Sequence, residues 1–213
     1  MGQEILFSWQ GKTQQVRVPL VGGFQGENLM LASAMVLATG VASENVFAAL
    51  NAMRPVRGRM ELAAIRSNGA SIFVDYAHTP DALATALKSL RRHAMGRLVV
   101  VFGAGGDRDH SKRKLMGQVA SEFADYTFLT DDNPRNEEPS EIRAMVLAGA
   151  PNSIEVADRA EAILRAVDFL QAGDTLLIAG KGHESGQIVG SDILPFDDVE
   201  QASIAVAALE GAY

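Results

Sequence analysis

Short apolar runs recur along the second part of this chain, and several of them end directly in a loop rich in glycine or charge. Three such loops stand out, at residues 103–109, 130–135 and 180–184. The stretches between the apolar runs have helical spacing, and alternating β and α elements with short connections predict a mostly parallel, doubly wound α/β sheet. Ligands bind beyond the carboxyl ends of the strands in such sheets. We therefore expect the three loops to converge on one small charged molecule.

The elements expected from about residue 60 onward alternate regularly. Strands are predicted at 61–66, 71–75, 97–102, 126–130, 153–156 and 174–179. Helices are predicted at 80–94, 112–124, 140–148, 158–171 and 198–209, with a short hairpin at 186–196. Thr79 can cap the first of these helices, and Pro80 fits its first turn. Asp158 and Asp197 begin two others, each followed by a glutamate at the spacing of a capping box.

The beginning of the chain has a different pattern. We expect two strands at 4–9 and 14–20, joined by a turn, and two helices at 28–39 and 43–53. Residues 22–28 are predicted to be a glycine-rich lead into the first helix. Residues 54–61 contain proline, glycine and three arginines, a composition typical of a linker. We therefore place a domain boundary there, with residues 1–57 on one side and 58–213 on the other.

Composition excludes several classes of protein. The chain of 213 residues has a net charge of −7, which argues against broad nucleic-acid binding. No apolar run approaches the roughly 20 residues that span a bilayer. The first residues lack the basic region of a secretory signal, so we expect a cytoplasmic location and no membrane partner. Zero cysteines exclude disulfides and thiolate metal sites.

Two familiar nucleotide-binding patterns are missing. The stretch Gly11-Lys12-Thr13 resembles the end of a phosphate loop, but Leu6 stands where that loop needs its earlier glycine. Residues 103–109 fail the dinucleotide fingerprint, because Arg108 occupies the place of the third glycine. The chain therefore contains no Walker-type loop.

The loop at 103–109 carries more charge than a turn needs. Arg108 lies between two aspartates, and a histidine, two lysines and an arginine follow by residue 114. We favour a ligand site here, while a tight turn with a solvated surface is the alternative.

The stretch Asp132-Asn133-Pro134-Arg135 suits the head group of an amino acid. Pro134 has a fixed φ and holds the residue before it extended. Asp132 can accept a hydrogen bond from an ammonium, Asn133 can both donate and accept, and Arg135 can fork onto a carboxylate. An Asx-type turn with a surface arginine is the alternative.

The loop at 180–184 allows close approach of a ligand to the backbone at its two glycines. Glu184 is suited to an ammonium and Lys181 to an anion. His183 is a possible base, although a lone histidine in a loop is more often structural.

A fourth strand end carries Asp75 and His78. Asp75 is placed for a ribose hydroxyl or a metal-bound water, and His78 for a base or a phosphate contact. Arg59 can reach a phosphate. The alternatives are a local backbone role for Asp75 beside a helix cap, and a linker role for Arg59.

Together these residues resemble the Mur ligase family, the ATP-dependent amide ligases of peptidoglycan synthesis. The matching stretches follow the family order and lie at 58–61, 74–80, 103–113, 131–135 and 180–184. The resemblance is to the members that add meso-diaminopimelate, which carry Asp-Asn-Pro-Arg; lysine-adding members usually differ at the arginine.

The resemblance implies a role for each matching position. The residues implied to bind meso-diaminopimelate are Arg108, Asp132, Asn133, Pro134, Arg135, Gly180 and Glu184. Those implied to contact ATP are Asn28, Arg59, Asp75 and His78. The implied reaction joins meso-diaminopimelate to UDP-N-acetylmuramoyl-L-alanyl-D-glutamate (the UDP-MurNAc-dipeptide) through an acyl phosphate, with ATP and Mg²⁺. The implied partners are these small molecules, and we expect a monomer.

The chain departs from the family in its extent. The family has a UDP-sugar domain, a central ATPase domain with a phosphate loop, and a C-terminal amino-acid domain. Here residues 1–57 resemble only the tail of the central ATP-binding domain, and Gln25 stands where the family more often has asparagine. We expect a fragment without catalytic residues or Mg²⁺ ligands, unable to hydrolyse ATP alone. A stand-alone amino-acid-binding module and a folylpolyglutamate-synthetase-like domain are the alternatives; Asp-Asn-Pro-Arg argues against the latter.

Overall fold

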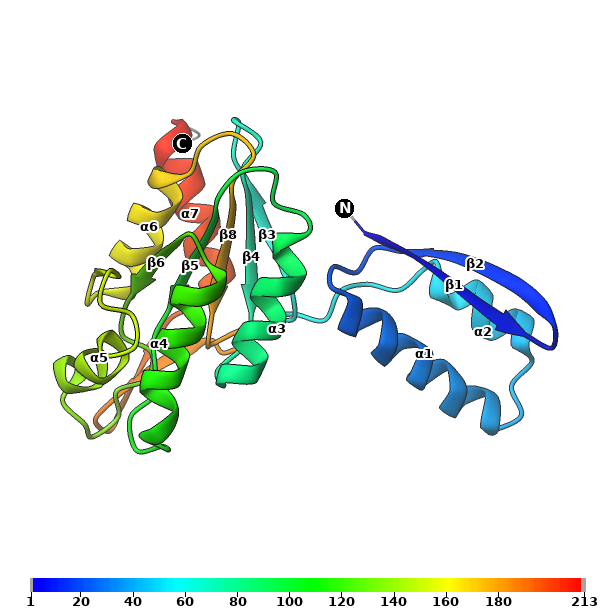
Figure 1. The fold of residues 1–213 in the computed structure, drawn as a ribbon, viewed down its shortest axis with the longest axis horizontal. Coiled ribbons are helices and arrows are strands. Elements are labelled where there is room, and N and C mark those ends of the chain that lie inside the picture. The colour runs from blue at the N-terminus through cyan, green and yellow to red at the C-terminus, as the bar shows by residue number, and fades with distance from the viewer. Residues whose placement is uncertain (1, 212–213) are drawn as a thin grey trace. The chain divides into compact units, whose positions relative to one another are not determined.

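The computed structural model describes residues 2–211, which divide into two compact units between Val56 and Arg57 (Figure 1). Among the described residues, no helix combines the length and the apolar character needed to cross a lipid bilayer.

The first unit is a hairpin with two helices. Strands β1 (Gln3–Trp9) and β2 (Lys12–Val18) pair antiparallel, and the turn between them uses positive φ angles of 49° at Gln10 and 77° at Gly11. Helices α1 (Gly23–Ala38) and α2 (Ser43–Leu50) follow. A small core holds the unit together; its buried members are Val16, Val18, Leu20, Leu29 and Leu50.

Helix α1 begins at Gly23, five residues earlier than the sequence predicts. The glycine density of residues 22–28 indicated a loop, but only Gly22 has the positive φ, 100°, of a non-helical residue. Gly26 is helical and faces β1, where a Cβ would lie 3.3 Å from Oε1 of Gln3. Close packing of the helix on the hairpin therefore explains a glycine that the sequence alone assigns to a loop.

The second unit is built on a six-stranded sheet. Its strand order is β3-β4-β8-β5-β6-β7, and only β3 runs antiparallel to its neighbour. The strands are β3 (Glu61–Ile65), β4 (Ser71–Asp75), β5 (Leu98–Phe102), β6 (Tyr126–Leu129), β7 (Ile154–Glu155) and β8 (Thr175–Ala179). The mostly parallel sheet predicted from the sequence is confirmed.

Helices cover both faces of this sheet. They are α3 (Pro80–Arg91), α4 (Ser111–Phe123), α5 (Pro139–Leu147), α6 (Arg159–Phe169) and α7 (Asp198–Glu210). Figure 1 shows α3 and α4 on one face and α7 on the other. A hairpin of β9 (Gly186–Val189) and β10 (Asp192–Pro195) precedes α7.

The capping residues predicted for three helices are confirmed. The side chains of Thr79, Asp158 and Asp197 each accept a hydrogen bond from a backbone N–H in the first turn of α3, α6 and α7, respectively.

The central strands β4, β5 and β8 are buried along their whole length, which explains their continuous apolar sequence.

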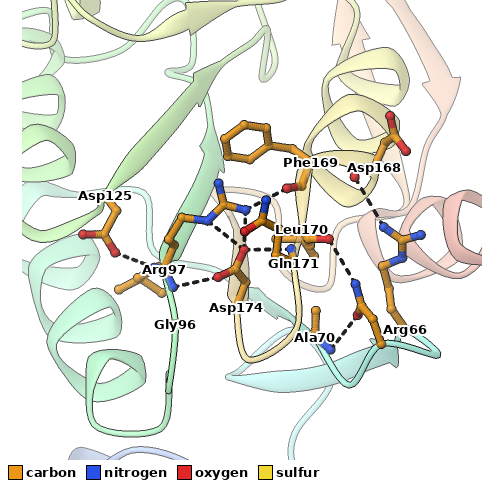
Figure 2. Close-up of polar contacts among 12 residues, drawn as sticks. Arg66, Ala70, Gly96, Arg97, Asp125, Asp168, Phe169, Leu170, Gln171 and Asp174 are labelled. Atoms are coloured by element: carbon orange, nitrogen blue, oxygen red, sulfur yellow. Dashed lines mark hydrogen bonds and ion pairs between the residues drawn. The ribbon is translucent and has the colours of Figure 1, made fainter.

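A polar cluster holds the amino ends of the strands, at the edge of the sheet away from the charged loops (Figure 2). The carboxylate of Asp174 accepts from the backbone N–H of Arg97 at 2.7 Å and of Gln171 at 2.8 Å, and from Nη2 of Arg97 at 2.6 Å. Burial by itself would raise the pKa of Asp174, but the hydrogen bonds from Arg97 and Gln171 outweigh it and lower the pKa. This ion pair ties the start of β5 to the start of β8.

Candidate functional site

Four neighbouring parallel strands, β4, β8, β5 and β6, end at one edge of the sheet. The loops that follow them enclose a pocket of about 410 Å³. Its lining comes from all four loops and the start of α4: Tyr76, His78, Thr79, Gly105, Arg108, Asp109, Lys112, Asp132, Asn133, Arg135, Gly180 and Glu184. The structure thus brings the three charged loops together, as the sequence predicts.

Most of the residues implied to bind the amino acid line this pocket. They are Arg108, Asp132, Asn133, Arg135, Gly180 and Glu184. Pro134 belongs to the same loop but is not a lining residue. Among the residues implied to contact ATP, His78 lines the pocket, Asp75 and Arg59 do not, and Asn28 lies in the first unit.

Asn133 is held in one orientation at the wall of the pocket. Its Oδ1 accepts from Nζ of Lys181 at 2.8 Å and from the backbone N–H of Ile188 at 3.0 Å. Its Nδ2 donates to Oε2 of Glu184 at 2.9 Å. The carbonyl oxygen of Asn133 is therefore already engaged by two protein donors, which departs from the expectation that it can accept from a ligand. A contact between Asn133 and an amino acid stays a prediction.

Lys181 also differs from its expected role. The sequence suggested an anion-binding lysine, but the side chain is 0% exposed and its ammonium contacts Asn133 and Glu184. A cation buried beneath the wall cannot receive a ligand from solvent. The sequence did not predict this placement, because nothing near Lys181 in the chain indicates that its side chain is buried.

Arg135 is fixed through its backbone. Its φ is +53°, in the region that few residues other than glycine adopt. Its N–H donates to the carbonyl of Ile188 at 3.0 Å, its carbonyl accepts from Gly190 at 2.7 Å, and its Nη1 donates to the carbonyl of Gly106 at 2.8 Å. The β9–β10 hairpin therefore holds the backbone of Arg135, and the Gly106 carbonyl holds its guanidinium at the pocket. Backbone strain of this kind is concentrated at functional positions.

The charged stretch that includes Arg108 and Arg113 contributes some side chains to the pocket and others to the protein interior. Arg108 lines the pocket, but Arg113 is fully buried and forms a two-pronged ion pair with Glu137, at 2.8 Å for each prong. Glu137 also accepts from the backbone N–H of Asp107 at 2.5 Å. The hydrogen bonds from Arg113 lower the pKa of Glu137 to about 2. Part of the charge that suggested a ligand site therefore anchors the loop, and no local pattern predicted that Glu137 is the partner of Arg113.

Asp75 has the local role considered as the alternative. Its two carboxylate oxygens accept from the backbone N–H groups of Met60 and Ala77, both at 2.8 Å. Burial raises the pKa of this carboxyl, and it is not among the lining residues. Asp75 thereby holds the start of β3 against the end of β4.

The pocket rim next to Asp75 is aromatic and cationic. The Arg59 guanidinium lies 4.8 Å from the centre of the Tyr76 ring, and the His78 ring lies 4.5 Å from it. Nδ1 of His78 is 2.8 Å from the Tyr76 carbonyl oxygen, and Nζ of Lys112 donates to the His78 carbonyl at 2.9 Å. His183 is exposed and packs beside Tyr76 at 5.2 Å. Arginine, lysine and histidine in this arrangement suit an anionic ligand.

Asn28 lies at a separate pocket of about 190 Å³ inside the first unit. The walls are largely apolar and include Leu20, Leu29, Ala32 and Met53. An exposed amide beside an apolar floor suits a planar heterocycle, which offers a flat face and hydrogen-bonding edges.

Among the described residues, no cluster of three or more histidine, aspartate or glutamate side chains has the geometry to hold a metal ion. The main pocket instead combines two guanidiniums with carboxylates. This combination of charges suits a zwitterion that carries an additional carboxylate.

Comparison with known proteins points to one family. Residues 58–182 match the family described as "Mur ligase, glutamate ligase domain". The chain is 53% identical over 206 residues to the UDP-N-acetylmuramoyl-L-alanyl-D-glutamate–2,6-diaminopimelate ligase of Bradyrhizobium diazoefficiens, and 51% identical over 209 residues to that of Zymomonas mobilis. These alignments cover 97% and 96% of this chain but only 42% and 43% of the relatives. The chain thus spans less than half the length of the curated relatives it matches.

Solved structures agree with this comparison. A structure of a UDP-N-acetylmuramoyl-L-alanyl-D-glutamate–2,6-diaminopimelate ligase matches with a TM-score of 0.71 and 39% identity, over 97% of this chain and 43% of that one. FolC of E. coli in complex with ADP matches with a TM-score of 0.68 over 97% of this chain and 44% of that one. Its 21% identity supports a shared fold only.

Proposed function

Since this chain belongs to the Mur ligase family, we propose that it supplies the amino-acid-binding part of an ATP-dependent ligase. The ligase adds meso-diaminopimelate to UDP-N-acetylmuramoyl-L-alanyl-D-glutamate in the cytoplasm. In this proposal residues 58–213 are the amino-acid-binding domain, and residues 1–57 are the tail of the central ATP-binding domain. The relatives named for this activity, about half identical in sequence, support the proposal.

The proposed reaction has two balanced steps. The side-chain carboxylate of the D-glutamate takes the terminal phosphoryl group of ATP, giving an acyl phosphate and ADP. An amine of diaminopimelate then attacks the acyl carbon and the C–N bond forms. The nitrogen loses a proton to solvent, and phosphate leaves with the electron pair of the broken C–O bond. The residues of this chain orient the amine and balance charge, which are the main contributions of a protein to such a transfer.

The observation that carries the proposal is that Arg108, Arg135 and Glu184 line one pocket. Diaminopimelate is lysine with a second carboxylate on its far carbon. The two guanidiniums match the carboxylates, and Glu184 matches an ammonium. Lysine would leave a guanidinium without its partner. Because Arg108 is exposed and Arg135 is half-buried, the expected cost is roughly 1.5–3 kcal/mol, the range for a lost hydrogen bond to a charged group. This unpaired charge is the proposed basis for rejecting lysine.

The proposed contacts to ATP are Asn28, Arg59, Asp75 and His78. Within the second unit, the cationic rim near Tyr76 fits phosphates. The family resemblance is what supports Asn28. Asp75 is the weakest of the four, because both its oxygens already accept backbone hydrogen bonds. The described residues offer no cluster for Mg²⁺, so we assign no metal ligand to them.

A titration of the chain with meso-diaminopimelate and with L-lysine tests the proposal. Isothermal calorimetry should give binding of diaminopimelate and about 10- to 100-fold weaker binding of lysine, since 1.4 kcal/mol corresponds to a factor of ten. Arg135→Gln should weaken diaminopimelate more than lysine. Arg92→Gln, at an exposed position outside the pocket, is the matched control. Equal affinity for both amino acids, or none for either, would contradict the site assignment.

A further inference from the structure

Lys181 is buried where a lysine is seldom found. Its side chain is 0% exposed, although lysine is almost never fully buried without a partner. The ammonium donates to Oδ1 of Asn133 at 2.8 Å and to Oε2 of Glu184 at 3.3 Å. Both partners line the pocket, whereas Lys181 itself does not. It therefore lies behind the wall and acts on groups that face the ligand.

The contact with Asn133 selects one orientation of the amide. An asparagine side chain has nearly the same shape when its oxygen and nitrogen exchange places. Here the oxygen meets two donors, Nζ of Lys181 and the backbone N–H of Ile188. The exchanged orientation would put the NH₂ group against both donors, and Lys181 provides the shorter of the two contacts.

The oriented amide in turn directs Glu184. Oε2 of Glu184 accepts from Nδ2 of Asn133 at 2.9 Å as well as from Lys181. Within residues 2–211, no protein donor within hydrogen-bond distance engages the other oxygen, Oε1. The Glu184 side chain is 33% exposed and lines the pocket, so this oxygen remains for a ligand.

We propose that Lys181 is a positioning residue, whose ammonium locks the Asn133 amide and one oxygen of Glu184 so that the other oxygen receives the ammonium of the bound amino acid. The identity of that amino acid rests on the function proposed above. The alternative is that Lys181 only fills space in the core. The two possibilities differ in whether its effect passes through Glu184.

A double-mutant cycle separates them. Lys181→Met keeps the length of the side chain and removes its donors. Calorimetric titration with meso-diaminopimelate should show binding weakened about 10- to 100-fold, the range expected for losing a hydrogen bond to a charged group. In a Glu184→Gln background the same change should cost less than about threefold, because residues in one network are not additive. Lys114→Met, exposed on α4 and outside the pocket, is the control. Equal losses in both backgrounds would overturn the proposal.

Chemical rescue gives a second, independent measurement. The chain has no cysteine, so Lys181→Cys introduces a single thiol. Alkylation of the unfolded chain with bromoethylamine, followed by refolding, restores an ammonium at nearly the original length; alkylation with bromopropane gives a neutral side chain of similar size. The aminoethyl form should bind diaminopimelate and the propyl form should be weakened like Lys181→Met. Equal affinity of the two forms would overturn the proposal. These forms also take the place of Lys181→Met if circular dichroism shows that variant unfolded.

A measurement without ligand separates this inference from the proposed function. The side-chain amide of Asn133 should give one sharp pair of ¹H–¹⁵N resonances in the parent chain. In Lys181→Met the pair should broaden or double, because the second orientation becomes populated. If the parent binds no diaminopimelate but the resonances change, the function fails and the positioning role stands. Unchanged resonances would refute the positioning role whatever the ligand.

Discussion

The ion pair between Arg159 and Asp198 lies under the floor of the pocket and gives the sharpest stability prediction. Both side chains are 0% exposed. Nε of Arg159 donates to Oδ1 of Asp198 at 2.8 Å, Nη2 donates to Oδ2 at 2.7 Å, and Nη2 also donates to the Ala179 carbonyl at 3.0 Å. The pair therefore joins the first turns of α6 and α7 to the end of β8, immediately before Gly180.

The free energy of unfolding that is lost on breaking this pair depends on the charged group that stays buried. Arg159→Met leaves the Asp198 carboxylate buried without its cation, and removal of one member of a buried pair costs roughly 3–5 kcal/mol. Each kcal/mol lowers Tm by about 2–4 °C in a domain of this size. The expected fall is therefore roughly 6–20 °C. Arg159→Met combined with Asp198→Leu removes both charges and should recover most of the loss, since apolar replacement of a whole buried pair is often neutral.

Urea and thermal unfolding of the single and double variants measure these values. The control is Arg165→Met on the same helix, where the ion pair with Glu161 is about half exposed (57% and 49%) and should contribute less than about 0.5 kcal/mol. Arg159→Met within about 1 kcal/mol of the parent would refute the reasoning. A double variant as unstable as the single one would also refute it, because the loss would then come from packing.

Two further predictions concern the loops around the pocket. The folded pKa of Glu137, about 2, lies below its ordinary 4.5, so its ion pair stabilises the fold above pH 4.5 and this contribution disappears as the pH falls toward 2. Urea midpoints should therefore fall less over this interval in Glu137→Gln than in the parent, and parallel curves would contradict the assignment. Gly106→Ala would place a Cβ 1.9 Å from the Pro134 carbonyl oxygen and should cost about 1–3 kcal/mol in thermal unfolding. Gly23→Ala, which meets open space, is its control, and equal Tm values for the two would show that the loops separate freely.

The amino-acid sequence determined the elements and the edge at which the site forms. The apolar runs and the three capping residues are local signals, because each specifies the structure of residues close to it in the chain. The convergence of three strand-end loops on one site was therefore predictable, because parallel strands present their carboxyl ends together. The Asp-Asn-Pro-Arg stretch likewise carried the family resemblance without any tertiary information.

Only the tertiary structure decided which charged groups face the ligand and which support the wall. Arg108 and Arg113 belong to one charged stretch of sequence, yet the first lines the pocket from a loop and the second, on α4, is buried against Glu137. Asn133 and Lys181 are 48 residues apart, and only folding shows that the lysine fixes the amide. The physical reason is that the sequence specifies the charge of each side chain directly. Its burial and its hydrogen-bond partners depend on segments that are distant along the chain.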